Sequence, residues 1–188
     1  MTGRSVSQRA ALRRHASADL AARARRIKAA VFDVDGVMTD GRIYLGESGE
    51  EMKAFNVADG HGLKMLREAG IEVAILSGRR AACVERRAAE LGIAHVIQGA
   101  GEKLPAFLQL LASLRVDATQ AAYMGDDVPD LPVLQACGLA FSVPDAPIGV
   151  RRAAQHVVAR RGGEGAVRDA CEFLLRLRAR APRASREG

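Results

Sequence analysis

The stretch VFDVDGVMTDG, residues 31–41, places Asp33 and Asp35 two positions apart, directly after an apolar run. Two carboxylates at close range resist joint ionisation, so the pair needs a chemical reason. One aspartate can act as a nucleophile that forms an aspartyl-phosphate, and the other can protonate the leaving group and then activate water. Residues i and i+2 lie on the same side of a strand, so we expect both carboxylates to reach one substrate.

Further polar residues follow later apolar runs. These are Ser77 in ILSGR, Lys103, and the acidic group Asp126, Asp127 and Asp130 in GDDVPD. Several carboxylates in one crevice repel one another unless a cation joins them, and oxygen-only ligands favour a hard ion such as Mg²⁺. A lysine and a serine hydroxyl beside them suit a phosphate group. Together these residues predict phosphoryl transfer, in which positioning and charge neutralisation dominate catalysis.

Elements that can position these residues alternate along the chain. We expect strands over residues 27–35, 71–78, 93–99, 121–127, 139–143 and 154–160. Helices are expected over residues 59–70, 79–92, 102–116, 128–138 and 164–181, with a hairpin over 41–57. This alternation predicts an α/β fold with a Rossmann-like, doubly wound parallel sheet. Ligands of such sheets bind beyond the carboxyl ends of the strands, so the polar residues should converge on one rim.

Charge is distributed unevenly along the 188 residues. The net charge is +7 over residues 1–28, −7 over residues 29–150 and +6 over residues 151–188. An enzyme that acts on nucleic acid needs its positive field around the site, so the acidic centre argues against nucleic acid as a partner. We expect a basic N-terminal arm over residues 1–16, one phosphatase domain over 17–178, and a flexible tail over 179–188.

Two further patterns concern the compartment. No apolar run approaches the roughly 20 residues of a membrane helix, and the first residues lack the apolar segment of a secretory signal. The three cysteines, Cys83, Cys137 and Cys171, are odd in number and widely spaced, which argues against a disulfide framework and against zinc. We expect a cytoplasmic protein with no membrane partner.

The motifs resemble a known superfamily. The aspartate pair followed by GVMTDG, the serine of ILSGR, the later lysine and GDDVPD are similar to the four motifs of the haloacid dehalogenase phosphatases. Over residues 17–177, the stretches DGRIYLGESGEEMKAFNVADGHGLKML, SGRRAACVERRAAELGI and GGEGAVRD closely resemble the capless 3-deoxy-D-manno-octulosonate 8-phosphate phosphatases. That resemblance implies a homotetramer that hydrolyses this small sugar phosphate with Mg²⁺ in lipopolysaccharide precursor synthesis.

The resemblance also implies roles for individual residues. Asp33 matches the nucleophile and a Mg²⁺ ligand. Asp35 matches the general acid and base, whose backbone carbonyl binds the same ion. Asp126 matches the third protein ligand, and Asp127 and Asp130 match the residues that support it.

The resemblance places ten residues against the substrate, and Ser77 and Lys103 bind its phosphate. The ten are Asp35, Asn56, Val57, Ala58, Asp59, Gly60, Lys64, Arg79, Arg87 and Lys103. The chain departs from the family pattern at two of them. Ala58 stands where a basic residue is common, and Lys64 stands where arginine is common and so lacks the guanidinium fork. These departures leave a second substrate open, such as a nine-carbon ulosonate 9-phosphate.

Spacing leaves no room for a cap domain. Asp33 and Ser77 are 44 residues apart, and Ser77 and Asp126 are 49 residues apart, and the expected hairpin, helices and strands fill both intervals. An aspartyl-phosphate needs a site that limits access of water, which a neighbouring subunit could cover. We expect the hairpin, with exposed Ile43, Tyr44 and Met52, to form an interface, and GGEGAVRD to reach the next site.

Two functions of other classes remain open at this point. Signalling receiver domains also carry an acidic cluster, a serine or threonine and a lysine on a parallel sheet, but their phosphoacceptor aspartate lies on a later strand, and they do not turn over. An RNA-binding protein driven by its basic ends is the other alternative. Deletion of residues 1–14 would then abolish RNA binding while the core stays folded.

Overall fold

A six-stranded sheet forms the centre of the computed structural model, which describes residues 18–47 and 51–179. Its strand order is β5-β4-β1-β6-β7-β8, and every neighbouring pair is parallel. The strands are β1 (Ala29–Phe32), β4 (Glu72–Ser77), β5 (His95–Gln98), β6 (Ala121–Met124), β7 (Leu139–Ser142) and β8 (His156–Val157). The predicted doubly wound parallel sheet is therefore confirmed.

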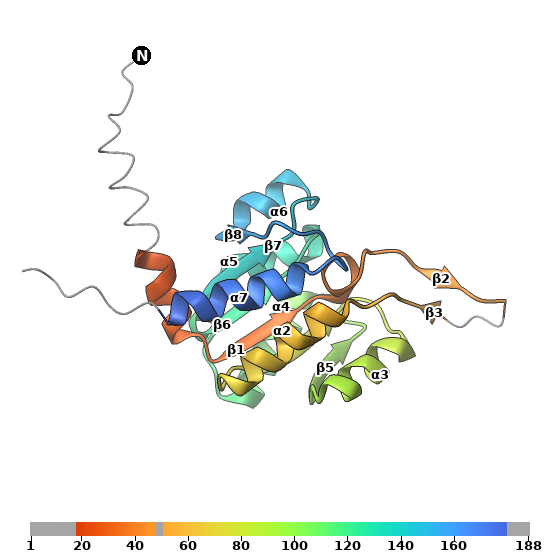
Figure 1. The fold of residues 1–188 in the computed structure, drawn as a ribbon, viewed down its shortest axis with the longest axis horizontal. Helices are drawn as coiled ribbons and strands as arrows, with labels where there is room; N and C mark the ends of the chain where they lie inside the picture. Colours follow the sequence, from red (N-terminus) through yellow and green to blue (C-terminus); the bar gives the residue numbers. More distant parts are fainter. Residues whose placement is uncertain (1–17, 48–50, 180–188) are drawn as a thin grey trace, which may run out of the picture.

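Helices cover both faces of this sheet. On one face, α2 (Val57–Glu68) and α7 (Ala166–Arg178) pack side by side (Figure 1). On the other, α4 (Lys103–Leu114) contacts α5 (Leu131–Ala136). The remaining helices are residues 18–26, α3 (Ala82–Leu91), α6 (Ile148–Ala153) and the short turns η1 (Val34–Met38), η2 (Ala118–Gln120) and η3 (Val128–Asp130). None of the helices in the described ranges is long and apolar enough to cross a membrane.

The core is built on the middle strands. Every residue of β1, β6 and β7 is buried, as expected for strands covered by helices on both faces. Phe107 of α4 packs edge-on against Tyr123 of β6, with ring centroids 5.7 Å apart. This contact packs α4, which begins at Lys103, against the strand that leads to Asp126.

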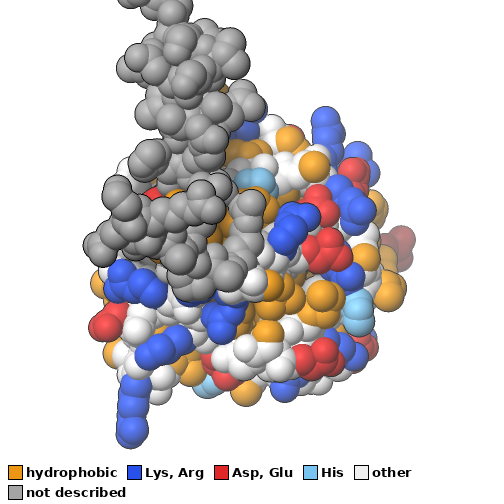
Figure 2. All heavy atoms as spheres, turned by 60° about the vertical axis from the view of Figure 1, so that its left-hand side comes forward, with side chains coloured by type: hydrophobic (Ala, Val, Ile, Leu, Met, Phe, Trp, Pro, Cys, Tyr) orange, Lys and Arg blue, Asp and Glu red, His pale blue; other side chains and the backbone are white. Residues whose placement is uncertain are grey.

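The surface carries mixed charge. In Figure 2, basic and acidic side chains of the described residues alternate over the visible face, with apolar side chains between them. The predicted arm over residues 1–16 lies outside the described part of the chain, and so does the tail over 179–188 apart from its first residue.

Several elements differ from the expected ones, among them the helix over residues 18–26, which was not expected. β1 ends at Phe32, so Asp33 and Asp35 follow the strand, and the prediction that they share one side of it is wrong. The chain turns there because Gly36 has a φ of +82°, which an L side chain rarely adopts. α2 begins two residues early, because the Asn56 side chain caps it by accepting from the Ala58 N–H at 2.8 Å. α6 was not expected.

The hairpin between β1 and α2 is short and projects from the body (Figure 1). β2 (Tyr44–Leu45) and β3 (Glu51–Met52) pair antiparallel, and residues 48–50 of the turn lie outside the described ranges. Within the described ranges, no second domain interrupts the chain between β1 and β4 or between β4 and β6.

Asp59 joins α2 to α7. The N-cap residue of α7 is Gly165, which has no side chain to accept the first N–H groups of the helix. Asp59 supplies the missing acceptor, because its Oδ1 accepts from the Arg168 N–H at 2.7 Å. The Asp59 side chain is buried, and burial raises its pKa to about 6 despite this hydrogen bond. Asp59, predicted to contact substrate, therefore caps a helix in the single chain.

Two substitutions of Asp59 test separately how its charge and its hydrogen bond affect stability. Because the folded-state pKa lies above the ordinary value of 3.8, the wild type should lose free energy of unfolding relative to Asp59→Asn as the pH rises from 3.8 through about 6. Asp59→Ala leaves the Arg168 N–H unpaired and should lose about 1–2 kcal/mol at every pH. Urea denaturation across this pH range measures both effects. If the free energies of unfolding of the wild type and Asp59→Asn change with pH in the same way, the raised pKa of Asp59 is contradicted. Asp19→Asn, at an exposed position on the 18–26 helix, is the control.

Candidate active site

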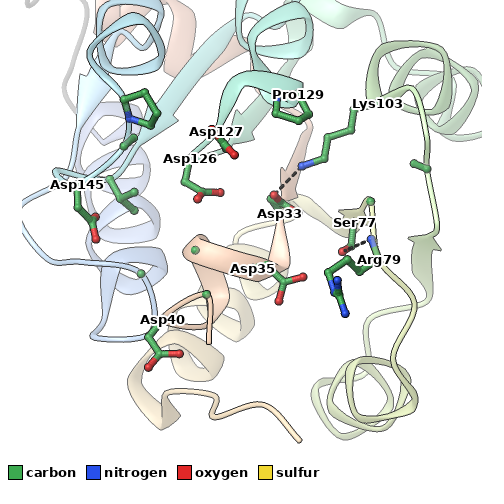
Figure 3. Close-up of a pocket in the computed structure, with 18 of the residues that line it drawn as sticks. Asp33, Asp35, Asp40, Ser77, Arg79, Lys103, Asp126, Asp127, Pro129 and Asp145 are labelled. Carbon is green, nitrogen blue, oxygen red and sulfur yellow. Dashed lines mark hydrogen bonds and ion pairs between the residues drawn. The ribbon is translucent and has the colours of Figure 1, made fainter. Parts of the chain in front are cut away.

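A cavity of about 540 Å³ opens at the carboxyl ends of β1, β4 and β6 (Figure 3). β1 lies between β4 and β6, so the cavity sits where the strand order reverses, which is the usual ligand position in such sheets. The residues predicted to do chemistry that line it are Asp33, Asp35, Ser77, Arg79, Lys103, Asp126 and Asp127. The sheet thus brings together residues from four separate segments.

Asp33 is held from three sides. Its backbone N–H donates to the carbonyl of Met124 on β6 at 3.0 Å. Its carboxylate accepts from the Val34 N–H at 2.7 Å and from the Lys103 ammonium at 2.6 Å. The side chain is buried, so the carboxylate has one fixed orientation at the floor of the cavity.

Asp130 is buried and saturated with donors. One oxygen accepts from the Lys103 ammonium at 2.6 Å and from the Tyr123 hydroxyl at 2.5 Å. The other accepts from the backbone N–H groups of Asp126 and Asp127, both at 3.1 Å. Four hydrogen bonds leave this carboxylate little capacity for a ligand, so its evident task is to hold the loop after β6 and to orient Lys103.

Asp126 differs from Asp130 in the hydrogen bonding of its carboxylate. Its Oδ1 is buried and has no hydrogen-bond partner in the described part of the chain. The carboxylate lies against Gly36, where a Cβ atom would overlap it, so a glycine is required at that turn. A buried, unpaired carboxylate oxygen is costly unless another group approaches it, which indicates a ligand position.

The electrostatics of the cluster point to a cation. Oxygens of Asp33, Asp126 and Asp130 lie within 4.8 Å of one another, with the ammonium of Lys103 paired to two of them. Burial, and then repulsion from Asp33 and Asp130, raises the pKa of Asp126 to about 8. Burial likewise raises the pKa of Asp33 to about 6, although Lys103 opposes it. These all-oxygen donors fit a hard divalent cation such as Mg²⁺, which the unpaired Oδ1 of Asp126 and a remaining lone pair of the Asp33 carboxylate could hold.

Ser77 and Asp35 lie on the other wall of the cavity. Ser77 is buried at the end of β4, and its hydroxyl accepts from the Arg79 N–H at 3.3 Å. Figure 3 shows Asp35 between Asp33 and Arg79. The carboxylate of Asp35 forms an ion pair with Lys53, which comes directly after β3. No role was predicted for Lys53, because a single lysine in a polar hairpin does not by itself indicate chemistry.

Seven of the predicted substrate contacts do not line the cavity of the single chain: Asn56, Val57, Ala58, Asp59, Gly60, Lys64 and Arg87. Asn56 donates its amide N–H to the Gly163 carbonyl at 3.1 Å, besides capping α2. Arg87 donates to the Asn56 carbonyl at 3.5 Å and forms an ion pair with Glu90 at 3.1 Å. Val57, Ala58 and Lys64 are exposed, and Gly60 is buried against Arg87. Their substrate contacts remain a prediction.

Other residues line the cavity without having been predicted. They include Asp40, Gly41, Asp145, Pro147 and Gly162. Gly162 packs on the backbone of the turn after β1, where a Cβ atom would overlap the Gly36 carbonyl. Gly162 belongs to GGEGAVRD, which was expected to reach the site of a neighbouring subunit, whereas here Gly162 lines the cavity of its own chain. No sequence signal pointed to Asp145.

Comparison with known proteins decides the family. A family model for haloacid dehalogenase-like hydrolases matches residues 50–138. The chain is 49% identical over 160 residues, 85% of each chain, to the 3-deoxy-D-manno-octulosonate 8-phosphate phosphatase of Escherichia coli K12. The corresponding enzyme of Yersinia pestis is 48% identical, with 84% of each chain covered. The chain belongs to the family of 3-deoxy-D-manno-octulosonate 8-phosphate phosphatases.

Solved structures of this family share the fold. The phosphatase of Moraxella catarrhalis, in complex with magnesium, phosphate and KDO, has a TM-score of 0.82 and 42% identity, covering 85% of this chain and 91% of that one. A cobalt-bound phosphatase of Haemophilus influenzae has a TM-score of 0.80 and 45% identity, covering 83% and 91%. Two phosphatases of the family thus bind divalent metal ions.

The metal site predicts opposite effects of Asp126→Asn on stability and on Mg²⁺ binding. Without divalent ions, the substitution should raise the free energy of unfolding by about 1 kcal/mol at pH 8, because it removes one of three crowded carboxylates. Mg²⁺ should raise the melting temperature of the wild type, more at pH 8 than at pH 5.5, because protons compete with the metal for the raised-pKa carboxylates.

Thermal unfolding with EDTA or Mg²⁺ at the two pH values tests this. Asp126→Asn should show little Mg²⁺ stabilisation, and Asp19→Asn should behave as the wild type. An equal Mg²⁺ shift in Asp126→Asn and the wild type would show that the ion binds elsewhere.

Proposed function

We propose that this protein hydrolyses 3-deoxy-D-manno-octulosonate 8-phosphate to 3-deoxy-D-manno-octulosonate and phosphate, in lipopolysaccharide precursor synthesis. The observation that carries the proposal is the buried cluster of Asp33, Asp126, Asp130 and Lys103 at the strand ends. Its charge and donor set suit a divalent cation with a phosphate group, and the family membership supports the substrate. Ser77 and Lys103 are the proposed phosphate contacts.

The first step forms a covalent intermediate. A carboxylate oxygen of Asp33 attacks the phosphorus, and the bond between phosphorus and the sugar oxygen breaks. The electron pair of that bond stays on the sugar oxygen, which takes a proton from the carboxyl group of Asp35. The sugar leaves as an alcohol, and an aspartyl-phosphate remains on Asp33.

The second step restores the enzyme. Asp35, now a carboxylate, takes a proton from a water molecule whose oxygen attacks the phosphorus. The bond between phosphorus and Asp33 breaks, and inorganic phosphate is released. Bound Mg²⁺ supplies charge neutralisation for the phosphoryl oxygens. The carboxylates of Asp33 and Asp126, with the backbone carbonyl of Asp35, are the groups proposed to hold it.

Substitution of the nucleophile tests the proposed chemistry together with the substrate. Wild-type protein with Mg²⁺ should release phosphate from 3-deoxy-D-manno-octulosonate 8-phosphate, and Asp33→Asn should lower kcat by roughly 10³-fold or more, because the amide cannot form the intermediate. A nine-carbon ulosonate 9-phosphate assayed in parallel measures substrate preference. Release from a generic aryl phosphate but from neither sugar would keep the chemistry and discard the substrate.

We further propose that the protein acts as a homotetramer whose hairpins pack together. Large apolar side chains gather on the hairpin: Ile43, Tyr44, Leu45 and Met52, of which Leu45 is 72% exposed. Such a group on a projecting element of a capless phosphatase suits an interface that also covers the open cavity. The three free thiols support the cytoplasm as the compartment.

Light scattering tests the assembly. The wild type should have the mass of four 20.0-kDa chains, and Leu45→Glu should lower it, because a buried charge opposes the packing. Leu108→Glu, at an exposed apolar position on α4, is the matched control and should leave the mass unchanged. A single-chain mass for the wild type would contradict the proposal.

A further inference from the structure

Lys53 lies in the hairpin stretch that resembles the family, but no role was predicted for it. It follows β3 on the hairpin, and its side chain is only 1% exposed. Its ammonium forms ion pairs with the carboxylate of Asp35 and with that of Glu51, the latter at 2.8 Å. A charge removed from water in this way is tolerated only when it is paired, so the two carboxylates fix where the ammonium lies.

The ion pairs continue across the cavity wall. Glu51 also pairs with Arg79 at 3.5 Å, and the backbone N–H of Arg79 donates to the hydroxyl of Ser77 at 3.3 Å. A chain of polar contacts therefore runs from the turn after β1, through the hairpin, to the loop after β4. Through Lys53 and Glu51, the hairpin is therefore tied to two segments of one cavity wall, the turn after β1 and the loop after β4.

The two aspartates of the pair thus have separate lysines. Lys103, at the start of α4, holds Asp33 within the buried acidic cluster. Lys53 pairs with Asp35 from the hairpin. Among the described residues, the ion pairs of the cluster formed by Asp33, Asp126 and Asp130 are to Lys103, so Asp35 has a different cation from the cluster.

We infer that Lys53 is a positioning residue that fixes the carboxyl group of Asp35 for proton transfer. The inference rests on the proposed function for the role of Asp35, and adds that the hairpin belongs to the catalytic machinery. Without Lys53 the Asp35 side chain can rotate about its own bonds, so its proton is less often in line with the sugar oxygen. An alkoxide leaving group needs that proton, whereas nitrophenolate leaves without it.

Single-turnover kinetics with enzyme in excess isolate this step. For Lys53→Met, release of the sugar from 3-deoxy-D-manno-octulosonate 8-phosphate should slow by about 10–100-fold. Release of nitrophenolate from p-nitrophenyl phosphate should stay within about threefold of the wild type. Lys53→Arg, which keeps a cation in reach of Asp35, should recover much of the lost rate. Lys28→Met, an exposed lysine at the amino end of β1, is the control.

A second variant tests whether misfolding of Lys53→Met could account for its loss of activity. Lys53→Met leaves Glu51 without its nearest cation, so Lys53→Met/Glu51→Gln removes the unpaired acid as well. The double variant should show the same selective loss on the sugar phosphate, with a melting temperature near that of the wild type.

Three results would overturn the inference. An unchanged rate on the sugar phosphate would show that Asp35 needs no support. An equal loss on both substrates would make Lys53 part of the scaffold, and a raised KM with kcat retained would make it a substrate contact. If the wild type itself turns over neither phosphate, the proposed function fails together with the inference.

Discussion

The ammonium of Lys103, placed between Asp33 and Asp130, is the interaction on which the rest of the site depends. It joins the start of α4 to the turn after β1 and to η3, three segments that are far apart in the sequence. Without it, the neighbouring carboxylates of Asp33, Asp126 and Asp130 would lose the cation that is paired with two of them. The parallel sheet makes the contact possible, because the strand ends meet at one edge.

A single lysine does not neutralise three carboxylates. The cluster therefore keeps a net negative charge, which favours a bound cation. Both carboxylate oxygens of Asp130 accept hydrogen bonds, from Lys103, Tyr123 and two backbone N–H groups. In the described part of the chain, one buried oxygen of Asp126 has no hydrogen-bond partner. In the proposed mechanism, Asp33 and Asp126 bind the divalent ion. Asp35, which is paired with Lys53 and not with Lys103, is the proposed proton donor.

Much of this could be predicted from the sequence, because apolar runs followed by polar residues mark the ends of buried strands. That pattern placed Asp33, Ser77 and Asp126 at one edge of the sheet, where the structure has them. What it missed depends on contacts between distant segments. Lys53 looks like a solvated hairpin residue until the hairpin folds back on Asp35. The hydrogen bond by which Asp59 caps α7 joins residues 109 positions apart, so no local pattern predicts it.

The central claim is that the carboxylate of Asp33, fixed by Lys103, takes the phosphoryl group itself. The most direct measurement is rapid acid quenching during turnover of the sugar phosphate, followed by borohydride reduction and peptide mapping. Reduction of an aspartyl-phosphate converts that aspartate to homoserine. We expect homoserine at position 33 alone, formed only when substrate and Mg²⁺ are both present. Rapid turnover with no modified residue at any sampled time, or modification at Asp126 or Asp130, would contradict this expectation.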